Sequence, residues 1–157
     1  MASKTHVIDL TGTGYCASFN FRRTARAVTS LFDEALQASG IRSTQFTILV
    51  GIRKIQPASM GAIAKVLVID RTTLTRSLRL LEKQGLLSIS GRSKMRQRFV
   101  SLTPQGERAL ALALPLWRKI QSQFIDAIGS DYWLNLRKEL ERLSSLATNL
   151  ENGKPAS

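Results

Sequence analysis

The chain has 157 residues, 43% of them apolar, and its 23 Lys and Arg residues against 11 Asp and Glu residues give a net charge of +12. This composition predicts a single globular unit and argues against disorder. No apolar run reaches the roughly 18 residues of a membrane span, and residues 1–10 hold no apolar export signal. We expect a cytoplasmic protein with a polyanionic partner, nucleic acid being favoured over an anionic membrane surface.

The sequence gives little indication of catalytic activity. Cys16 is the only cysteine and His6 the only histidine, which excludes an internal disulfide and argues against a zinc site. A glycine-rich phosphate loop and a Ser/His/Asp set are also missing from the sequence, so we expect no enzyme activity, no cofactor and no metal. Aromatic residues make up only 6% of the chain and fall mostly on apolar stripes, which disfavours stacking on unpaired RNA bases.

The first half of the chain predicts helices. Residues 1–16 are expected to be a flexible lead-in. A long helix follows over residues 17–38, and Ser39-Gly40 ends it. Ser43 is predicted to cap a second helix that reaches about residue 54, and Ser59 to cap a short helix that reaches residue 67. The long helix has an apolar stripe at spacings of three and four: Phe21, Ala25, Val28, Phe32 and Ala35.

Asp70 is a natural N-cap for a helix over residues 71–84, which Gly85 ends. On a wheel of 100° per residue, Leu74, Leu78 and Leu81 fall together on one face. The opposite face presents Thr and Arg, which suits the major groove of DNA. With the preceding short helix and a three-residue turn, this segment predicts a helix-turn-helix. A solvated amphipathic helix is the simpler alternative.

A β-hairpin and two helices complete the chain. Residues 86–90 and 98–102 have strand character, with Gly91 opening the turn between them. Thr103-Pro104 then predicts a helix that reaches about residue 128, in which Pro115 should cause a kink or break one hydrogen bond. A last helix is predicted over residues 131–150, with a narrow apolar seam like that of a coiled coil, and residues 151–157 are expected to be a flexible tail.

Positive charge is concentrated in residues 59–103, where nine Lys and Arg accompany two acidic residues, a net of +7. Such concentration is typical of a nucleic-acid footprint. Arg92, Lys94, Arg96 and Arg98 alternate along the hairpin and could follow a minor groove or a line of phosphates. We take the candidate DNA-binding residues to be Ser59, Arg71, Thr72, Thr73, Thr75, Arg76, Arg79, Lys83, Arg92, Lys94, Arg96 and Arg98.

Several segments together resemble the multiple-antibiotic-resistance regulator (MarR) family of bacterial winged helix-turn-helix repressors. The resemblance covers about residues 16–148. Its most specific parts are residues 19–28 (FNFRRTARAV), 43–49 (STQFTIL), 70–76 (DRTTLTR) with 80–86, and 101–106 (SLTPQG).

The resemblance implies a mostly α fold with a small β-hairpin, in which residues 43–103 form the winged helix-turn-helix. It implies a homodimer built from residues 17–38 and 104–150. Helix 71–84 would enter the major groove of a pseudo-palindromic operator, and a wing at about 91–97 the minor groove. A small, often aromatic or phenolic effector would release the protein, which would associate with the nucleoid only when bound to DNA.

Two positions depart from the family pattern. The family wing usually carries Asp-x-Arg, but Lys94 stands at the Asp position while Arg96 matches the Arg. The wing therefore gains charge and loses the carboxylate that would brace its arginine. Some family members sense hydroperoxides through a cysteine near the first long helix, which aligns here with Ser18, two residues after Cys16. Redox sensing by Cys16 is thus one reading and simple packing another.

Arg22, Arg23 and Arg26 on the first long helix could hold an effector carboxylate, or they could contact the dimer partner or a phosphate. We expect a dimeric, sequence-specific regulator of transcription that binds double-stranded DNA. The alternative is a weakly specific architectural DNA-binding protein without an effector.

Overall fold

The computed structural model describes residues 9–56, 58–91, 98–151 and 153. The chain divides into two compact units, Met1–Ala113 and Leu114–Ser157, and one long helix, α5 (Pro104–Ile128), runs through the boundary. Within the described ranges, no helix is both long and apolar enough to cross a membrane.

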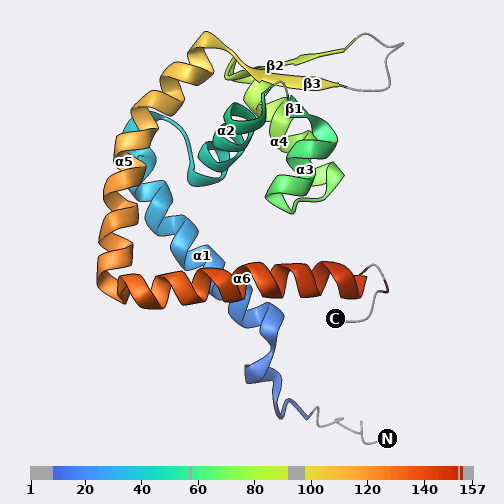
Figure 1. Cartoon of the computed structure of the whole chain (residues 1–157), viewed down its shortest axis with the longest axis vertical. Helices are drawn as coiled ribbons and strands as arrows, with labels where there is room; N and C mark the ends of the chain where they lie inside the picture. The colour runs from blue at the N-terminus through green and yellow to red at the C-terminus, as the bar shows by residue number, and fades with distance from the viewer. Residues whose placement is uncertain (1–8, 57, 92–97, 152, 154–157) are drawn as a thin grey trace, which may run out of the picture. The chain divides into compact units, whose positions relative to one another are not determined.

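The first unit contains most of the helices predicted from the sequence (Figure 1). A single 3-10 turn, Thr13–Tyr15, precedes α1, and a second, Gln37–Ser39, follows it before Gly40 turns the chain. The helices and strands of the unit before α5 are α1 (Ala17–Leu36), α2 (Ser43–Ile55), β1 (Ala58–Ser59), α3 (Met60–Leu67), α4 (Arg71–Lys83), β2 (Leu87–Ser90) and β3 (Phe99–Leu102).

The sheet has three antiparallel strands in the order β1-β3-β2. The predicted hairpin is confirmed, and it pairs Leu87 with Leu102 and Ser90 with Phe99. The third strand, β1, was not predicted, and it pairs Ala58 with Val100 across more than forty residues of chain. The structure is therefore mostly α with a small three-stranded sheet instead of a hairpin alone.

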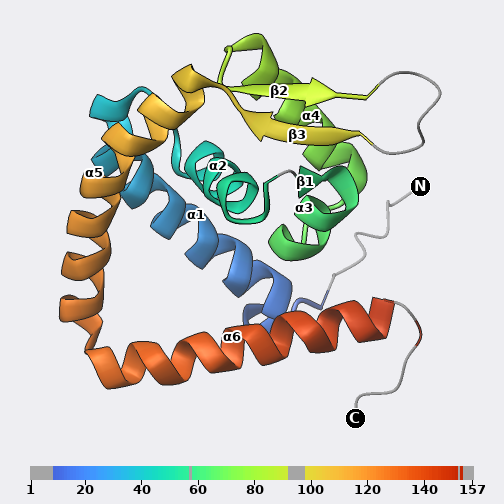
Figure 2. The ribbon, with the colours of Figure 1, turned by 45° about the horizontal axis from the view of Figure 1, so that its top comes forward.

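The core of this unit lies between the helices and the sheet. Helix α2 contacts both α1 and β3 (Figure 2), while α4 contacts β2. Burial of these aliphatic side chains is the main favourable contribution to folding of the unit. The side chains that are almost fully buried are Leu36, Leu49, Ile52, Ile63, Leu74, Leu78, Leu81, Leu87 and Val100.

The start of α2 differs from the prediction. Ser43 is the first helical residue and not the N-cap, which is Arg42. The side chain of Asp33, on α1, accepts hydrogen bonds from the backbone N–H and the hydroxyl of Ser43. Gln45 accepts a bond from the backbone N–H of Arg42 at 2.9 Å. A carboxylate from another helix thus satisfies an N–H that a local cap would otherwise serve.

The second unit consists of the later turns of α5 and of α6 (Ser130–Glu151). Pro115 lies inside α5, as predicted, and the helix continues through it to Ile128. Phe124 and Trp133 meet edge to face with ring centroids 6.3 Å apart. No residue of α6 is fully buried, and Tyr132, Leu134 and Leu150 are exposed.

Candidate nucleic-acid interface

Helix α4 begins at a short turn that the sequence predicted. The Oδ1 atom of Asp70 accepts a hydrogen bond from the backbone N–H of Thr73 at 2.8 Å. Hydrogen bonding by the side chain of Thr73, and then by its backbone N–H, favours the charged carboxylate, so the pKa of Asp70 lies below its ordinary value of 3.8. Val68, in the turn, has a φ of 49°, which is a strained conformation for a β-branched residue.

Two opposite faces of α4 carry different chemistry. Leu74, Leu78 and Leu81 are buried against the first unit's core, so the predicted wheel is confirmed. The other face exposes basic side chains and threonines to solvent. The candidate residues that α4 exposes are Arg71, Thr72, Thr73, Arg76, Arg79 and Lys83.

Two candidate hydroxyls already serve the backbone. Thr75 is half-buried and its hydroxyl donates to the carbonyl of Arg71 at 2.7 Å. The hydroxyl of Ser59, at the junction of β1 and α3, accepts from the backbone N–H of Ala62 at 3.2 Å, which confirms its predicted cap. Each hydroxyl still has hydrogen-bonding capacity, but its orientation is set by the helix that it supports.

The base of the hairpin lies beside α4. A groove of about 180 Å³ separates them and brings together three candidate residues: Thr75, Arg79 and Arg98. Glu82, Met60, Ile89 and Gly91 complete its lining. Arg98 is exposed, and its carbonyl accepts a bond from the N–H of Met60 at 3.3 Å. Arg92, Lys94 and Arg96 lie outside the described residues.

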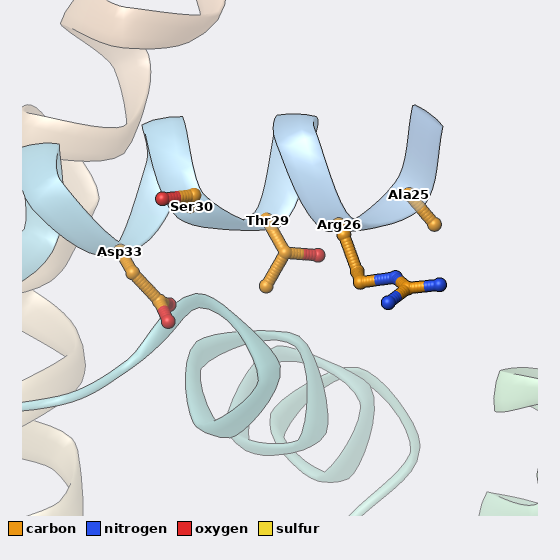
Figure 3. Close-up of a pocket in the computed structure, with 5 residues that line it drawn as sticks. All are labelled: Ala25, Arg26, Thr29, Ser30 and Asp33. Carbon is orange, nitrogen blue, oxygen red and sulfur yellow. The ribbon is translucent and has the colours of Figure 1, made fainter. Parts of the chain in front are cut away.

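A second, more open pocket of about 360 Å³ lies along α1, lined by Ala25, Arg26, Thr29, Ser30 and Asp33. Figure 3 shows Arg26, Thr29 and Asp33 directed toward the side of α1 where α2 lies. The Nε–H of Arg26 donates to the carbonyl of Arg22 at 3.3 Å. Arg22 and Arg23 are exposed on α1 and do not line this pocket. Of the three predicted effector-binding arginines, Arg26 is therefore the one that lines this pocket.

Cys16 is a free, exposed cysteine at the N-terminal end of α1. Its carbonyl accepts bonds from the backbone N–H and the side-chain amide of Asn20. It is therefore not a packing residue within the single chain, which was the simpler reading of the sequence.

The sequence reading missed Glu82 in the groove and Thr29 and Asp33 in the α1 pocket. The sequence marks Glu82 only as one of the two acidic residues between 59 and 103. Arg26, Thr29 and Asp33 follow the i, i+3, i+7 spacing of one helix face, so that spacing could have revealed the second pocket. The pairing of Glu82 with a strand formed by later residues has no comparable local signal.

A short helix, a three-residue turn, an amphipathic second helix and a hairpin of a three-stranded sheet together define a winged helix-turn-helix. The MarR family model matches residues 41–90, which span α2 through β2. A curated transcriptional regulator of Bacillus cereus is 34% identical over 98 residues. That match takes in 62% of this chain, and the chain spans 65% of the length of that relative.

Solved structures extend the likeness over nearly the whole chain. The transcriptional regulator MosR of Mycobacterium tuberculosis, in complex with DNA, is 32% identical, with a TM-score of 0.79. The match covers 86% of this chain and 98% of that one. The PcaV regulator of Streptomyces coelicolor, in complex with its natural ligand, shares the fold at 18% identity. Its TM-score is 0.75, and 94% of this chain and 99% of that chain are covered. The chain belongs to the MarR family of transcriptional regulators.

Proposed function

We propose that the chain is a dimeric transcriptional regulator, a repressor, that binds double-stranded DNA at a specific pseudo-palindromic operator. The observation that carries the proposal is the division of α4, which buries three leucines and exposes Arg71, Arg76 and Arg79. Arginine can make two hydrogen bonds to one guanine in the major groove. The MosR structure contains DNA, and its likeness to this chain supports DNA binding by this chain.

In this proposal the β2–β3 hairpin serves as the wing. Arg98 at its base would contact a phosphate, and Arg92, Lys94 and Arg96, which the structure leaves undescribed, would contribute charge toward the minor groove. Contacts of this kind add affinity with little sequence preference. The operator would therefore be selected mainly by α4, while the wing would set the affinity and its dependence on salt.

Dimerisation would bring two copies of α4 to two half-sites. The apolar side chains that α1 and α6 leave in solvent support it, because large apolar groups at solvent-facing positions mark surfaces for association. Phe19 and Phe21 on α1 are about half exposed, and no residue of α6 is buried within the single chain. Sedimentation velocity at micromolar protein should show a dimer, and a monomer at that concentration would contradict this part of the proposal.

An effector would bind in the α1 pocket, where the Arg26 guanidinium can donate hydrogen bonds to a carboxylate or a phenolate. The PcaV structure holds a natural ligand, which supports ligand control in this chain. An aromatic acid such as salicylate is a suitable first probe, added to the DNA complex at millimolar concentration. Release that Arg26→Ala abolishes would support this site.

The function is tested by selection from random duplexes at about physiological salt, followed by sequencing of the bound fraction. We expect an enriched inverted repeat with half-sites about one helical turn apart. Tight binding without an enriched motif would favour the architectural alternative, which the net charge of +12 makes the second candidate. A chain that binds no duplex at all would contradict both.

A further inference from the structure

Glu82 joins the recognition helix to the wing. It lies in the last turn of α4, and its Oε1 atom accepts a hydrogen bond from the backbone N–H of Ile89 at 3.3 Å. Ile89 belongs to β2, which is an edge strand because the sheet order is β1-β3-β2. An edge strand carries backbone N–H groups that no neighbouring strand can accept. Glu82 accepts one of them and so fixes β2 against α4.

The same carboxylate lies among positive charges. Glu82 is the only acidic residue in the groove that Arg79 and Arg98 also line. Among the described residues, neither of these arginines forms an ion pair with Glu82 within 4.0 Å. Its pairing is with the strand backbone instead, which leaves both guanidinium groups available to another anion. A carboxylate on a DNA-binding surface lowers the affinity for DNA because it repels phosphate. We therefore expect Glu82 to have a role that compensates for this loss.

We propose that Glu82 is a positioning residue for DNA binding, which holds the base of the wing at a fixed orientation to α4. With that orientation set, the arginines of α4 and those of the wing can contact one duplex at the same time. Restricting the wing in the free protein reduces the ordering cost of binding. This inference rests on the proposed function, because it assigns Glu82 a part in the same DNA complex.

Two substitutions separate the hydrogen bond from the charge. Glu82→Gln keeps an oxygen acceptor for the Ile89 N–H, and Glu82→Met keeps the length of the side chain but has no acceptor of that strength. Both remove one negative charge and both are good helix formers. Long-range electrostatic effects and helix propensity therefore cancel when the two variants are compared with each other.

We expect Glu82→Gln to bind the selected operator at least as tightly as the unaltered chain. Glu82→Met should bind about fivefold more weakly than Glu82→Gln, the effect of losing one hydrogen bond. The difference should shrink when Lys94 and Arg96 are both replaced by alanine, because the wing then keeps only Arg92 and Arg98 of its four basic side chains. A purely structural role would lower the melting temperature without this dependence on the wing.

The amide of Ile89 gives a readout that needs no DNA. Its hydrogen exchange should be faster in Glu82→Met than in Glu82→Gln. Equal operator affinity of the two variants, or a difference that persists unchanged after the wing charges are removed, would overturn the inference while the proposed function stands. An unaltered chain that selects no operator would overturn both.

Discussion

The carboxylate of Asp33 on α1 binds both polar groups of Ser43 at the start of α2, with its Oδ1 atom 2.7 Å from the backbone nitrogen and 2.6 Å from the hydroxyl oxygen. The same residue lines the pocket along α1. One side chain thus joins the candidate effector pocket to the helix on which the winged helix-turn-helix is built.

Replacing Asp33 by alanine should lower the free energy of unfolding by about 1–2 kcal/mol, because two half-buried donors at the start of α2 lose their acceptor. Urea titration followed by circular dichroism measures this. Asp33→Asn keeps a side-chain oxygen and should lose less. Equal losses in the two variants would show that charge, and not the hydrogen bonds, is what Asp33 provides.

Gly106 in α5 is required by a close backbone approach. A Cβ atom built there would lie 1.9 Å from the carbonyl oxygen of Leu86, at the point where α5 passes the start of the wing. Gly106→Ala should therefore displace the backbone and cost about 3 kcal/mol, at the upper end for overpacking.

Gly61 provides a matched control for this substitution. It lies in the helix α3, and a Cβ there would meet nothing within 4 Å, so Gly61→Ala should leave stability unchanged or raise it slightly. Thermal unfolding of the two variants compares them directly. A Gly106→Ala variant as stable as Gly61→Ala would contradict the close approach of Gly106 to the carbonyl of Leu86.

Replacing Val68 by glycine should stabilise the folded chain. Its φ of 49° is strained for a β-branched residue, and its side chain is 68% exposed, so replacing it removes strain and little burial. We expect Val68→Gly to gain about 1 kcal/mol in unfolding free energy. Val66→Gly, at an exposed site inside α3, should instead lose about 0.5 kcal/mol. Destabilisation by Val68→Gly would contradict the left-handed turn.

The Asp70 cap predicts a dependence of stability on pH. Its pKa is lowered chiefly by the hydrogen bond from Thr73, so the folded chain holds the proton less tightly than the unfolded chain. The stabilisation is therefore complete above the ordinary carboxyl pKa and is lost as pH falls through the lowered value. Asp70→Asn keeps a capping oxygen, and its stability should fall less below about pH 4. Identical acid profiles would contradict the assignment.

Helix α4 could be predicted because its signals lie close together in the sequence. Contacts between segments far apart in the sequence could not be predicted. Asp70 and the spacing of Leu74, Leu78 and Leu81 lie within a single helix, so the sequence contains the whole pattern. Strand β1 has two residues, Ala58 and Ser59, and exists only because β3 lies beside it. The carboxylate that accepts hydrogen bonds from Ser43, the first residue of α2, belongs to Asp33, ten residues earlier. No local pattern marks a bond between two helices.

The residues of the candidate site could likewise be predicted only where local periodicity marks them. Exposure of the arginines and threonines on α4 followed from helical periodicity. The groove beside Arg79 and Arg98 depends on how the hairpin packs against α4, and only the folded chain shows Glu82 within it. The open pocket on α1 includes Arg26 but not Arg22 or Arg23. Arg23 points in a different direction from Arg26, whereas Arg22 lies on the same face but one turn nearer the N-terminus than the residues that line the pocket.

The role of α4 as the recognition helix is tested by titrating the selected operator with the unaltered chain, with Arg76→Ala and with Arg137→Ala, an equal change of charge on α6. If α4 reads the operator, Arg76→Ala should weaken binding by about 1–3 kcal/mol and reduce the preference for operator over random duplex. Arg137→Ala should change both quantities little. Unchanged affinity and preference in Arg76→Ala would contradict the assignment of α4 as the recognition helix.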